Sequence, residues 1–200
     1  MIKIISKKKN FYKVFNLLKK SRNKNIFLTG GTSTITLYNY LNKKNFFISK
    51  NNFFLTDERI VDPKNFNETN TFSLLKKQKI KFTNFEELYF DNNFKPKKFI
   101  KKISSKNFKI DYLFLSFGHD GHISSIFKLN KTIKKNYKFT KSKFHKYKRF
   151  TISEKLISNS KKVFLIIKNK KRYKLYKKET TKLSNTPISV LKKYYLILLF

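Results

Sequence analysis

The chain has 200 residues, of which 40% are hydrophobic, and a formal net charge of +37. This length and apolar content predict one domain spanning residues 1–200. The lack of cysteine excludes a disulfide framework, a thiolate metal site and a cysteine nucleophile, and no apolar run predicts a signal peptide or a membrane span, so we expect a cytoplasmic protein.

Short apolar runs alternate with helical patterns along the chain. Such alternation is typical of a parallel sheet covered by helices on both faces, so the predicted fold class is α/β with a mostly parallel sheet. We predict strands over residues 26–29, 53–55, 112–117, 163–167 and 194–200. We predict helices over 35–41 (with Thr32 or Ser33 as N-cap), 71–77, 97–104 and 170–180, a short helix over 124–129, a polar loop over 62–70 and a mobile lysine-rich loop over 130–149.

All four glycines fall in two of the predicted loops, at positions 30 and 31 and at positions 118 and 121. Glycine is required where φ is positive or where the backbone must come close to a ligand. Both loops, and also the segment 57–59, directly follow predicted strands. Because the carboxyl ends of parallel strands share one edge of a sheet, the three segments should meet there and form one site.

The first loop combines two glycines, three hydroxyl side chains and the start of a helix. Free backbone N–H groups and the positive end of the helix dipole make it a candidate anion site, with an ordinary capped turn as the alternative. It lacks the Gly-Lys-Ser/Thr ending of a Walker loop and the third glycine of a dinucleotide fingerprint. Its residues are Gly30, Gly31, Thr32, Ser33 and Thr34.

The segment Asp57, Glu58 and Arg59 places two carboxylates beside one of only four arginines. A guanidinium can bind a phosphate or a carboxylate through two N–H groups. The alternative interpretation is a local ion pair on the surface, which would contribute little to stability.

The segment 118–122, which reads Gly-His-Asp-Gly-His, carries the sharpest functional signal. A histidine can take a proton from water near neutral pH, and a neighbouring carboxylate can orient its imidazole. A structural turn and a metal site are the alternatives, but we find no further metal ligand and expect no metal. The third histidine of the chain, His145, lies in the lysine-rich loop and is interpreted as incidental.

Together these motifs resemble the 6-phosphogluconolactonases of the glucosamine/galactosamine-6-phosphate isomerase superfamily. The resemblance rests on Leu-Thr-Gly-Gly-Thr-Ser at 28–33, Asp-Glu-Arg-Ile-Val at 57–61, Asn70 and the stretch 111–127, with further support from 149–152 and 187–191. Relative to this family the chain is short at both ends. It also departs from the family pattern at Ser116, His119 and Lys128.

The resemblance implies a Rossmann-like three-layer α/β/α fold and a hydrolase that uses neither a metal nor another cofactor. The implied reaction converts 6-phosphoglucono-1,5-lactone to 6-phosphogluconate in the pentose phosphate pathway, and the only expected partner is this sugar phosphate, bound by a monomer or a weak homodimer. By analogy, His122 activates the attacking water and Asp120 holds and tunes His122. Asn169, which tolerates positive φ, would replace a family glycine before a phosphate-binding cation. The implied substrate- and phosphate-binding residues are Gly30, Gly31, Thr32, Ser33, Thr34, Asp57, Arg59, Gly121, Arg149 and either Lys171 or Arg172.

Two other functions stay open at this stage. The deaminases of the same superfamily carry Asp-Glu-Tyr in place of residues 57–59, and the position of their later glutamate is Phe127 here, so the lactonase is favoured. A degenerate relative that binds polyanions would use the high charge. However, only four of the 48 basic residues are arginine and the lysines are spread along the chain, so drift toward AT-rich codons explains the charge better and we expect no specific nucleic-acid partner. The charge should still attract anionic metabolites.

Overall fold

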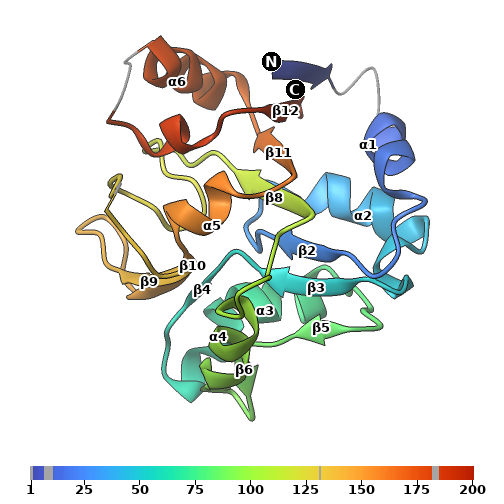
Figure 1. The fold of residues 1–200 in the computed structure, drawn as a ribbon, viewed down its shortest axis with the longest axis vertical. Helices are drawn as coiled ribbons and strands as arrows, with labels where there is room; N and C mark the ends of the chain where they lie inside the picture. The colour runs from blue at the N-terminus through green and yellow to red at the C-terminus, as the bar shows by residue number, and fades with distance from the viewer. Residues whose placement is uncertain (1, 7–10, 131, 182–184) are drawn as a thin grey trace.

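The computed structural model describes residues 2–6, 11–130, 132–181 and 185–200 (Figure 1). Seven strands form one sheet in the order β1-β12-β11-β8-β2-β3-β5, and each neighbouring pair is parallel. This confirms the predicted parallel α/β sheet. Its strands are β1 (Ile2–Ser6), β2 (Asn25–Leu28), β3 (Asn52–Leu55), β5 (Phe85–Glu86), β8 (Tyr112–Ser116), β11 (Lys162–Ile167) and β12 (Tyr194–Leu198).

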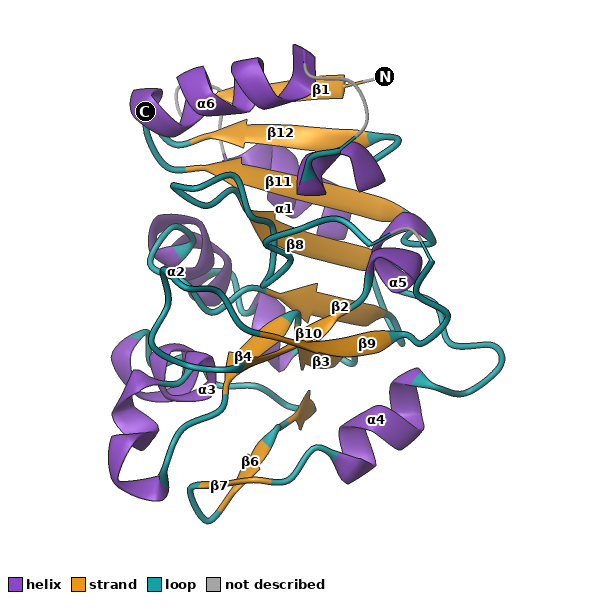
Figure 2. Ribbon diagram, turned by 90° about the vertical axis from the view of Figure 1, so that its left-hand side faces the viewer, coloured by secondary structure: helices purple, strands orange, loops and turns teal. Residues whose placement is uncertain are grey.

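Helices cover both faces of this sheet, which gives three layers. In Figure 2, α5, α6 and the ribbon that contains β9 and β10 lie in front of the sheet, and α1 lies behind it. None of the described helices is both long enough and apolar enough to cross a membrane. The helices are α1 (Phe11–Leu18), α2 (Ile35–Lys43), α3 (Asn70–Phe72), α4 (Lys97–Ile103), α5 (Glu154–Ser158) and α6 (Lys170–Thr181), with a π-helical turn over Ser73–Lys77 and 3-10 turns over Phe46–Ile48, Pro63–Glu68 and Pro187–Val190.

Two small antiparallel sheets complete the fold. One has the order β4-β10-β9 and consists of Asp57–Arg59, Arg149–Ile152 and Tyr137–Thr140. The other pairs β6 (Tyr89–Phe90) with β7 (Asn93–Phe94). The first of these small sheets brings the segment after β3 next to a segment about ninety residues later in the chain, and it thereby forms one wall of the site described below.

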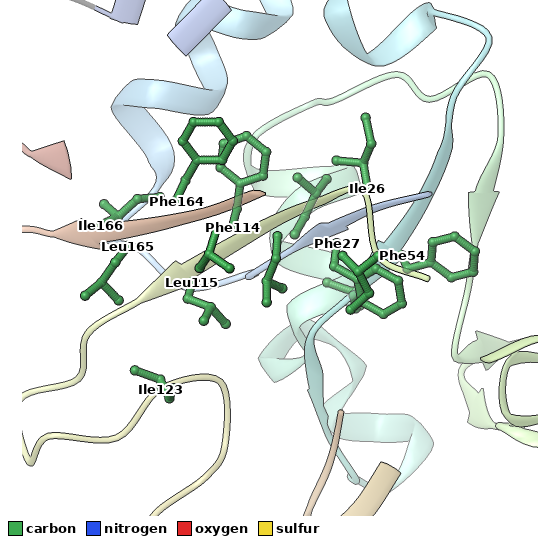
Figure 3. Packing of buried hydrophobic residues seen from close by; sticks show 14 of the residues in the cluster. Ile26, Phe27, Phe54, Phe114, Leu115, Ile123, Phe164, Leu165 and Ile166 are labelled. Atoms are coloured by element: carbon green, nitrogen blue, oxygen red, sulfur yellow. The ribbon is translucent and has the colours of Figure 1, made fainter. Parts of the chain in front are cut away.

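Side chains are packed on both sides of the large sheet, which explains why its strands are continuously apolar. Phe114 and Phe164 point to one side of the sheet, where their rings stack with centroids 4.8 Å apart, and Leu115 and Leu165 point to the other side, toward Ile123 (Figure 3). All five side chains are fully buried. Because both faces are covered, successive residues of a strand are apolar regardless of the face they occupy. The packed sheet gives a firm base to the loops at its carboxyl edge.

The predicted strands and the four longer predicted helices are confirmed, with ends that shift by one or two residues. α2 begins at Ile35, so the predicted N-cap at Thr32 or Ser33 is wrong and Thr34 occupies that position. The hydroxyl of Thr34 donates to the carbonyl oxygens of Gly31 at 2.9 Å and Thr29 at 3.4 Å, and so closes the turn before the helix.

The helix predicted over 124–129 is wrong. The segment forms a compact turn held by antiparallel bridges that link Ile123 to Phe117 and to Ile126. Ser124 has a φ of 53°, a left-handed conformation that a helix cannot contain. Its hydroxyl donates to the carbonyl oxygen of Thr56 at 3.1 Å, which ties the turn to the end of β3.

The expectation of an irregular loop over 130–149 is also wrong for residues 137–140, which form β9 and pair with β10. Tyr137 and Phe139 pack on the buried ring of Phe150, each with ring centroids 5.6 Å apart. Lysines between these aromatic residues obscured a short strand pattern. Lys131 lies outside the described residues.

The amino-terminal segment contains two elements that the sequence analysis did not predict, β1 and α1. β1 pairs with β12 from Ile2 opposite Tyr194 to Ser6 opposite Leu198. A strand this short and interrupted by a lysine has little signal of its own, since its pairing partner is far away in the sequence.

Candidate active site

The three predicted segments meet at the carboxyl edge of the sheet, around a pocket of about 250 Å³. Three of the four arginines and all three histidines of the chain line it. The sequence analysis therefore identified the correct edge of the sheet. The lining residues are Thr29, Gly31, Thr32, Ser33, Asp57, Arg59, Asn70, Ser116, Gly118, His119, His122, Ser124, His145, Arg149 and Arg172.

Within the first loop, Gly31, Thr32 and Ser33 line the pocket, whereas Gly30 and Thr34 support it from below. Gly30 lies against Asn70, and a Cβ added to it would come within 2.4 Å of the Asn70 Cβ. Only glycine permits this close approach. Asn70 in turn donates from Nδ2 to the carbonyl oxygen of Asp57 at 2.8 Å, so the first two segments are locked together.

Glu58 is a structural residue of the site for which the sequence analysis gave no role. Its fully buried carboxylate accepts hydrogen bonds from the backbone N–H groups of Arg59 (2.7 Å), Asn70 (2.6 Å) and Thr71 (2.7 Å), and from the Thr71 hydroxyl (2.7 Å). Burial raises the pKa of Glu58 to about 7, although these four hydrogen bonds oppose the rise. Glu58 therefore anchors the start of α3 to β4, directly under the pocket.

Asp57 was predicted to bind substrate, and it does line the pocket. Its carboxylate is buried, and each of its two oxygens already accepts a hydrogen bond, one from the Thr56 hydroxyl at 2.8 Å and the other from the Ser125 hydroxyl at 2.6 Å. These contacts hold the turn after His122 against the end of β3. The structure thus gives Asp57 a positioning role.

Arg59 and Arg149 face the pocket from adjacent strands and stand directly opposite each other in the β4–β10 register. Arg59 donates from Nη1 to the carbonyl oxygen of Glu68. Nε of Arg149 is buried and has no hydrogen-bond partner among the described residues. Burial lowers the pKa of Arg149, with the nearby Asp57 carboxylate opposing that effect. Two like charges in such a pair repel each other, and an anion between them would remove the repulsion.

Of the two cations predicted at 171 or 172, Arg172 is the one that lines the pocket. Its Nη1 donates to the hydroxyl of Ser33 at 2.7 Å and to the carbonyl oxygen of Phe117 at 3.2 Å, so it bridges the first loop and the end of β8. The positive φ expected at Asn169 is wrong, because this residue is not among those with positive φ. Its Oδ1 instead accepts from the backbone N–H of Arg172 at 2.9 Å, a hydrogen bond that caps α6.

In the loop after β8, the imidazole of His122 lies against the backbone of Gly118, four residues earlier in the chain. The N–H of Gly118 donates to the carbonyl oxygen of His122 at 2.8 Å. A Cβ at Gly118 would come within 2.3 Å of the His122 ring atoms Cε1 and Nδ1, so the ring needs a glycine at this position. Gly121 has a φ of 85° and lets the chain turn; it does not line the pocket.

Asp120 lies between two histidines. One carboxylate oxygen contacts Nδ1 of His122, and the other lies 3.3 Å from Nε2 of His145. Burial alone would raise the pKa of Asp120, but its hydrogen bonds with the two imidazoles hold that pKa below its usual value. Asp120 is therefore ionised and acts only as an acceptor.

The interpretation of His145 as incidental is wrong. Its side chain is only 16% exposed, and its ring packs on Phe127 with centroids 4.9 Å apart. The ring of His122 packs on the same Phe127 at 5.2 Å. No local motif marks His145, because it reaches the site only through the β9–β10 hairpin.

His145 also completes a set of side chains that could hold a divalent cation. One ligand atom each from Asp120, His122 and His145 lies within 4.8 Å of the others. The sequence analysis expected no metal because it found no third ligand. The three neighbouring arginines make the pocket more suitable for an anion than for a cation.

The arrangement combines a proton acceptor with an anion-binding wall. Because Nδ1 of His122 is turned toward Asp120, Nε2 is the ring nitrogen available to a water molecule in the pocket. Arg59, Arg149 and Arg172 supply positive charge on the other sides of the same pocket. Such a site can activate water against a substrate that carries a phosphate.

Comparison with known proteins identifies the family of the chain and proteins with a similar fold. The family model described as glucosamine-6-phosphate isomerases/6-phosphogluconolactonase matches residues 9–195. A 6-phosphogluconolactonase from Borreliella burgdorferi is 28% identical over 175 residues, which cover 80% of this chain and 74% of that protein. The fold is similar to that of a 6-phosphogluconolactonase from Thermotoga maritima (TM-score 0.77, 22% identity, 99% of both chains) and to that of one from Trypanosoma brucei (TM-score 0.78, 15% identity, 99% of this chain and 95% of the other).

Proposed function

Since the chain belongs to the glucosamine-6-phosphate isomerase/6-phosphogluconolactonase family, we propose that it hydrolyses 6-phosphoglucono-1,5-lactone to 6-phosphogluconate. The observation that carries the proposal is the position of His122, oriented by Asp120 in a pocket that three arginines line. The name of the Borreliella burgdorferi relative supports the choice of the lactonase branch.

In the proposed reaction, Nε2 of His122 takes a proton from a water molecule while the water oxygen attacks the lactone carbonyl carbon. A tetrahedral oxyanion forms and then collapses, and the bond between the carbonyl carbon and the ring oxygen breaks. His122 returns its proton to the departing ring oxygen, which becomes a hydroxyl group. The new carboxylic acid ionises near neutral pH, so each turnover releases one proton.

The role of Asp120 in this scheme is to keep His122 in the productive tautomer. An ionised carboxylate that accepts from Nδ1 places the basic lone pair on Nε2. It also stabilises the imidazolium that forms when His122 takes the proton. Asp120 itself stays ionised throughout.

The phosphate of the substrate would occupy the basic side of the pocket. Arg59 and Arg149 repel each other in the absence of an anion, and Arg172 completes a positive wall beside the Gly31–Ser33 loop. Guanidinium groups suit phosphate because they bind it through two N–H groups at once.

Phe127 argues against a sugar-phosphate deaminase. In the deaminase pattern this position carries a glutamate, which takes part in ring opening and proton transfer. Here its apolar ring packs against the imidazoles of both His122 and His145. Lactone hydrolysis needs only an activated water and a stabilised oxyanion, so the loss of that carboxylate leaves the proposed reaction intact.

The proposal is tested by the release of protons from freshly prepared 6-phosphogluconolactone, measured with a pH indicator above the spontaneous rate. We expect His122→Ala to lower the enzymatic rate by about 10²- to 10⁴-fold, the usual contribution of a general base. Lys128→Ala is the matched comparison, because Lys128 is exposed in the turn that follows the same loop and does not line the pocket; it should keep most of the rate.

Three results would count against the proposal. They are a wild-type rate equal to the spontaneous rate, an unchanged rate in His122→Ala, and ammonia release from glucosamine 6-phosphate as the main activity. Circular dichroism of His122→Ala, with a melting temperature close to that of the wild type, separates loss of chemistry from loss of folding.

A further inference from the structure

We infer that His145 is a positioning residue that donates a hydrogen bond to Asp120 and thereby fixes the carboxylate that orients His122. This inference rests on the proposed function and goes beyond it, because it adds a third member to the proton-transfer group. The member comes from the hairpin between β9 and β10, far in the sequence from the 118–122 loop.

The geometry shows why Asp120 needs a second partner. Its side chain is 23% exposed, and the loop that carries it contains two glycines. A carboxylate bound on one oxygen only can rotate and exchange its partner for water. With one oxygen on His122 Nδ1 and the other 3.3 Å from His145 Nε2, both of its oxygens are occupied and its plane is fixed.

His145 is itself held in place. Its ring packs on Phe127 at an interplanar angle of 33°, and its backbone N–H donates to the carbonyl oxygen of Ser142 at 3.2 Å. Burial lowers the pKa of His145, and the charges of Arg149 and His122 act in the same direction, against the opposing effect of Asp120. A neutral imidazole has one N–H group, and the acceptor-only carboxylate requires that N–H at Nε2. The inferred form of His145 is therefore the neutral Nε2–H tautomer.

A pair of substitutions at His145 separates this role from simple packing. His145→Phe keeps a ring on Phe127 but cannot donate, whereas His145→Gln places an amide N–H at a similar distance from the backbone. We expect His145→Phe to lower kcat by about 10- to 100-fold with little change in KM, a part of the 10²- to 10⁴-fold contribution of the base itself. His145→Gln should recover most of the loss.

Phe144→Leu serves as the control for the hairpin, since Phe144 is the adjacent residue and is 71% exposed. It should leave kcat unchanged. If His145→Phe raises KM and leaves kcat intact, His145 contacts the substrate and the inference is wrong. The inference is equally wrong if His145→Phe has the activity of the wild type, or if His145→Gln is no better than His145→Phe while both fold.

A second measurement does not depend on activity. The chain has only three histidines, so long-range ¹H–¹⁵N spectra of the imidazole rings can be assigned with single His→Gln variants. At pH 7.5 we expect the Nε2–H tautomer for His145 and the Nδ1–H tautomer for His122. In His145→Phe, the His122 signals should shift toward a mixture of tautomers. An Nδ1–H tautomer or an imidazolium at His145 would overturn the inference, even if the wild type hydrolysed no lactone and the proposed function failed.

Metal binding by the same three side chains is the competing arrangement. Dialysis against EDTA should leave the rate and the imidazole spectra unchanged. Loss of activity with EDTA that is restored by Zn²⁺ would make His145 a metal ligand and would overturn the inference.

Discussion

Two polar regions border the pocket, and they hold their charged groups in different ways. Under the pocket, the Glu58 carboxylate is fully buried and bound mainly by backbone N–H groups of Arg59, Asn70 and Thr71. At its rim, the Asp120 carboxylate is partly exposed and bound by the side chains of His122 and His145. Both carboxylates link segments of the chain that lie side by side. The contacts of Asp120 can be lost without disturbing the backbone, because its partners are side chains, whereas the contacts of Glu58 cannot.

The two arrangements predict a division between substitutions that affect folding and substitutions that affect chemistry. A buried carboxylate that satisfies backbone donors leaves those donors unpaired when it is removed, which is costly for stability. When a partly exposed carboxylate is removed, water can replace it as a hydrogen-bond partner. Its loss therefore affects the orientation of the side chains that it held, and affects stability little.

Glu58→Gln should give the largest loss of stability. An amide offers one acceptor oxygen in place of two, so its NH₂ group would face donors from Thr71. We expect the free energy of unfolding to fall by about 2–4 kcal/mol, measured by urea denaturation. Glu68→Gln is the control, because among the described residues its exposed carboxylate binds only the side chains of Tyr147 and Lys146, and it should change stability little. Equal losses in the two variants would contradict the division.

The same residue should make stability depend on pH. Burial raises the pKa of Glu58 from 4.5 to about 7, so the folded state keeps its proton at pH values where the unfolded state has lost it. The free energy of unfolding should therefore decrease as the pH rises from about 4.5 to 7, by up to about 3 kcal/mol. The wild-type slope should exceed the slope of Glu58→Gln over this range; identical slopes would show that the carboxylate is ionised throughout.

Gly118→Ala tests the rim. Its Cβ would come within 2.3 Å of the His122 imidazole, which must then move away from Asp120. We expect kcat to fall by about 10- to 100-fold, a part of the contribution of a general base, with a small change in stability. In the double variant with His122→Ala the contact disappears, and the stability should return to that of His122→Ala alone. Full activity of Gly118→Ala would show that the position of the ring is not critical.

Arg172→Lys should have the smallest effect, because it keeps the charge and loses the contacts with Ser33 and Phe117. We expect KM to rise about tenfold, equivalent to about 1.4 kcal/mol, with kcat within a factor of about three. Lys171→Ala is the matched control and should leave KM unchanged, since Lys171 does not line the pocket. The opposite pattern would assign the phosphate contact to Lys171.

The difference between the buried sheet and the edge of the pocket also explains which features could be predicted from the sequence. The buried strands have continuous apolar runs, and the glycine loops follow them directly, so the sheet and the edge that carries the site were both predictable. β4, β9 and β1 were not, because each is short, contains at least one charged residue and pairs with a strand that is distant or separated from it by a loop without a turn signal.

The same reasoning applies to the side chains of the site. His122 and Asp120 are identified by a local motif, whereas Glu58 and His145 are identified only by what surrounds them in space. In the sequence, Glu58 is typical of an acidic surface residue, and only the structure shows that three backbone N–H groups donate to it. His145 is, in the sequence, one polar residue among lysines. Thr34 and Asp57 were predicted to bind substrate, and the structure shows in addition that the Thr34 hydroxyl and the Asp57 carboxylate form hydrogen bonds within the protein.

The order of strands has a consequence for how the chain folds during its synthesis. β1 precedes every other strand of the sheet in the sequence, yet among the described strands it pairs only with β12, and Ile2 lies opposite Tyr194. β1 can therefore join the sheet only after β12 has been made, and the closure of so long a loop is slow. Until then β12 is missing from its place beside β11, and the apolar edge of β11 stays open to chaperones and to other chains.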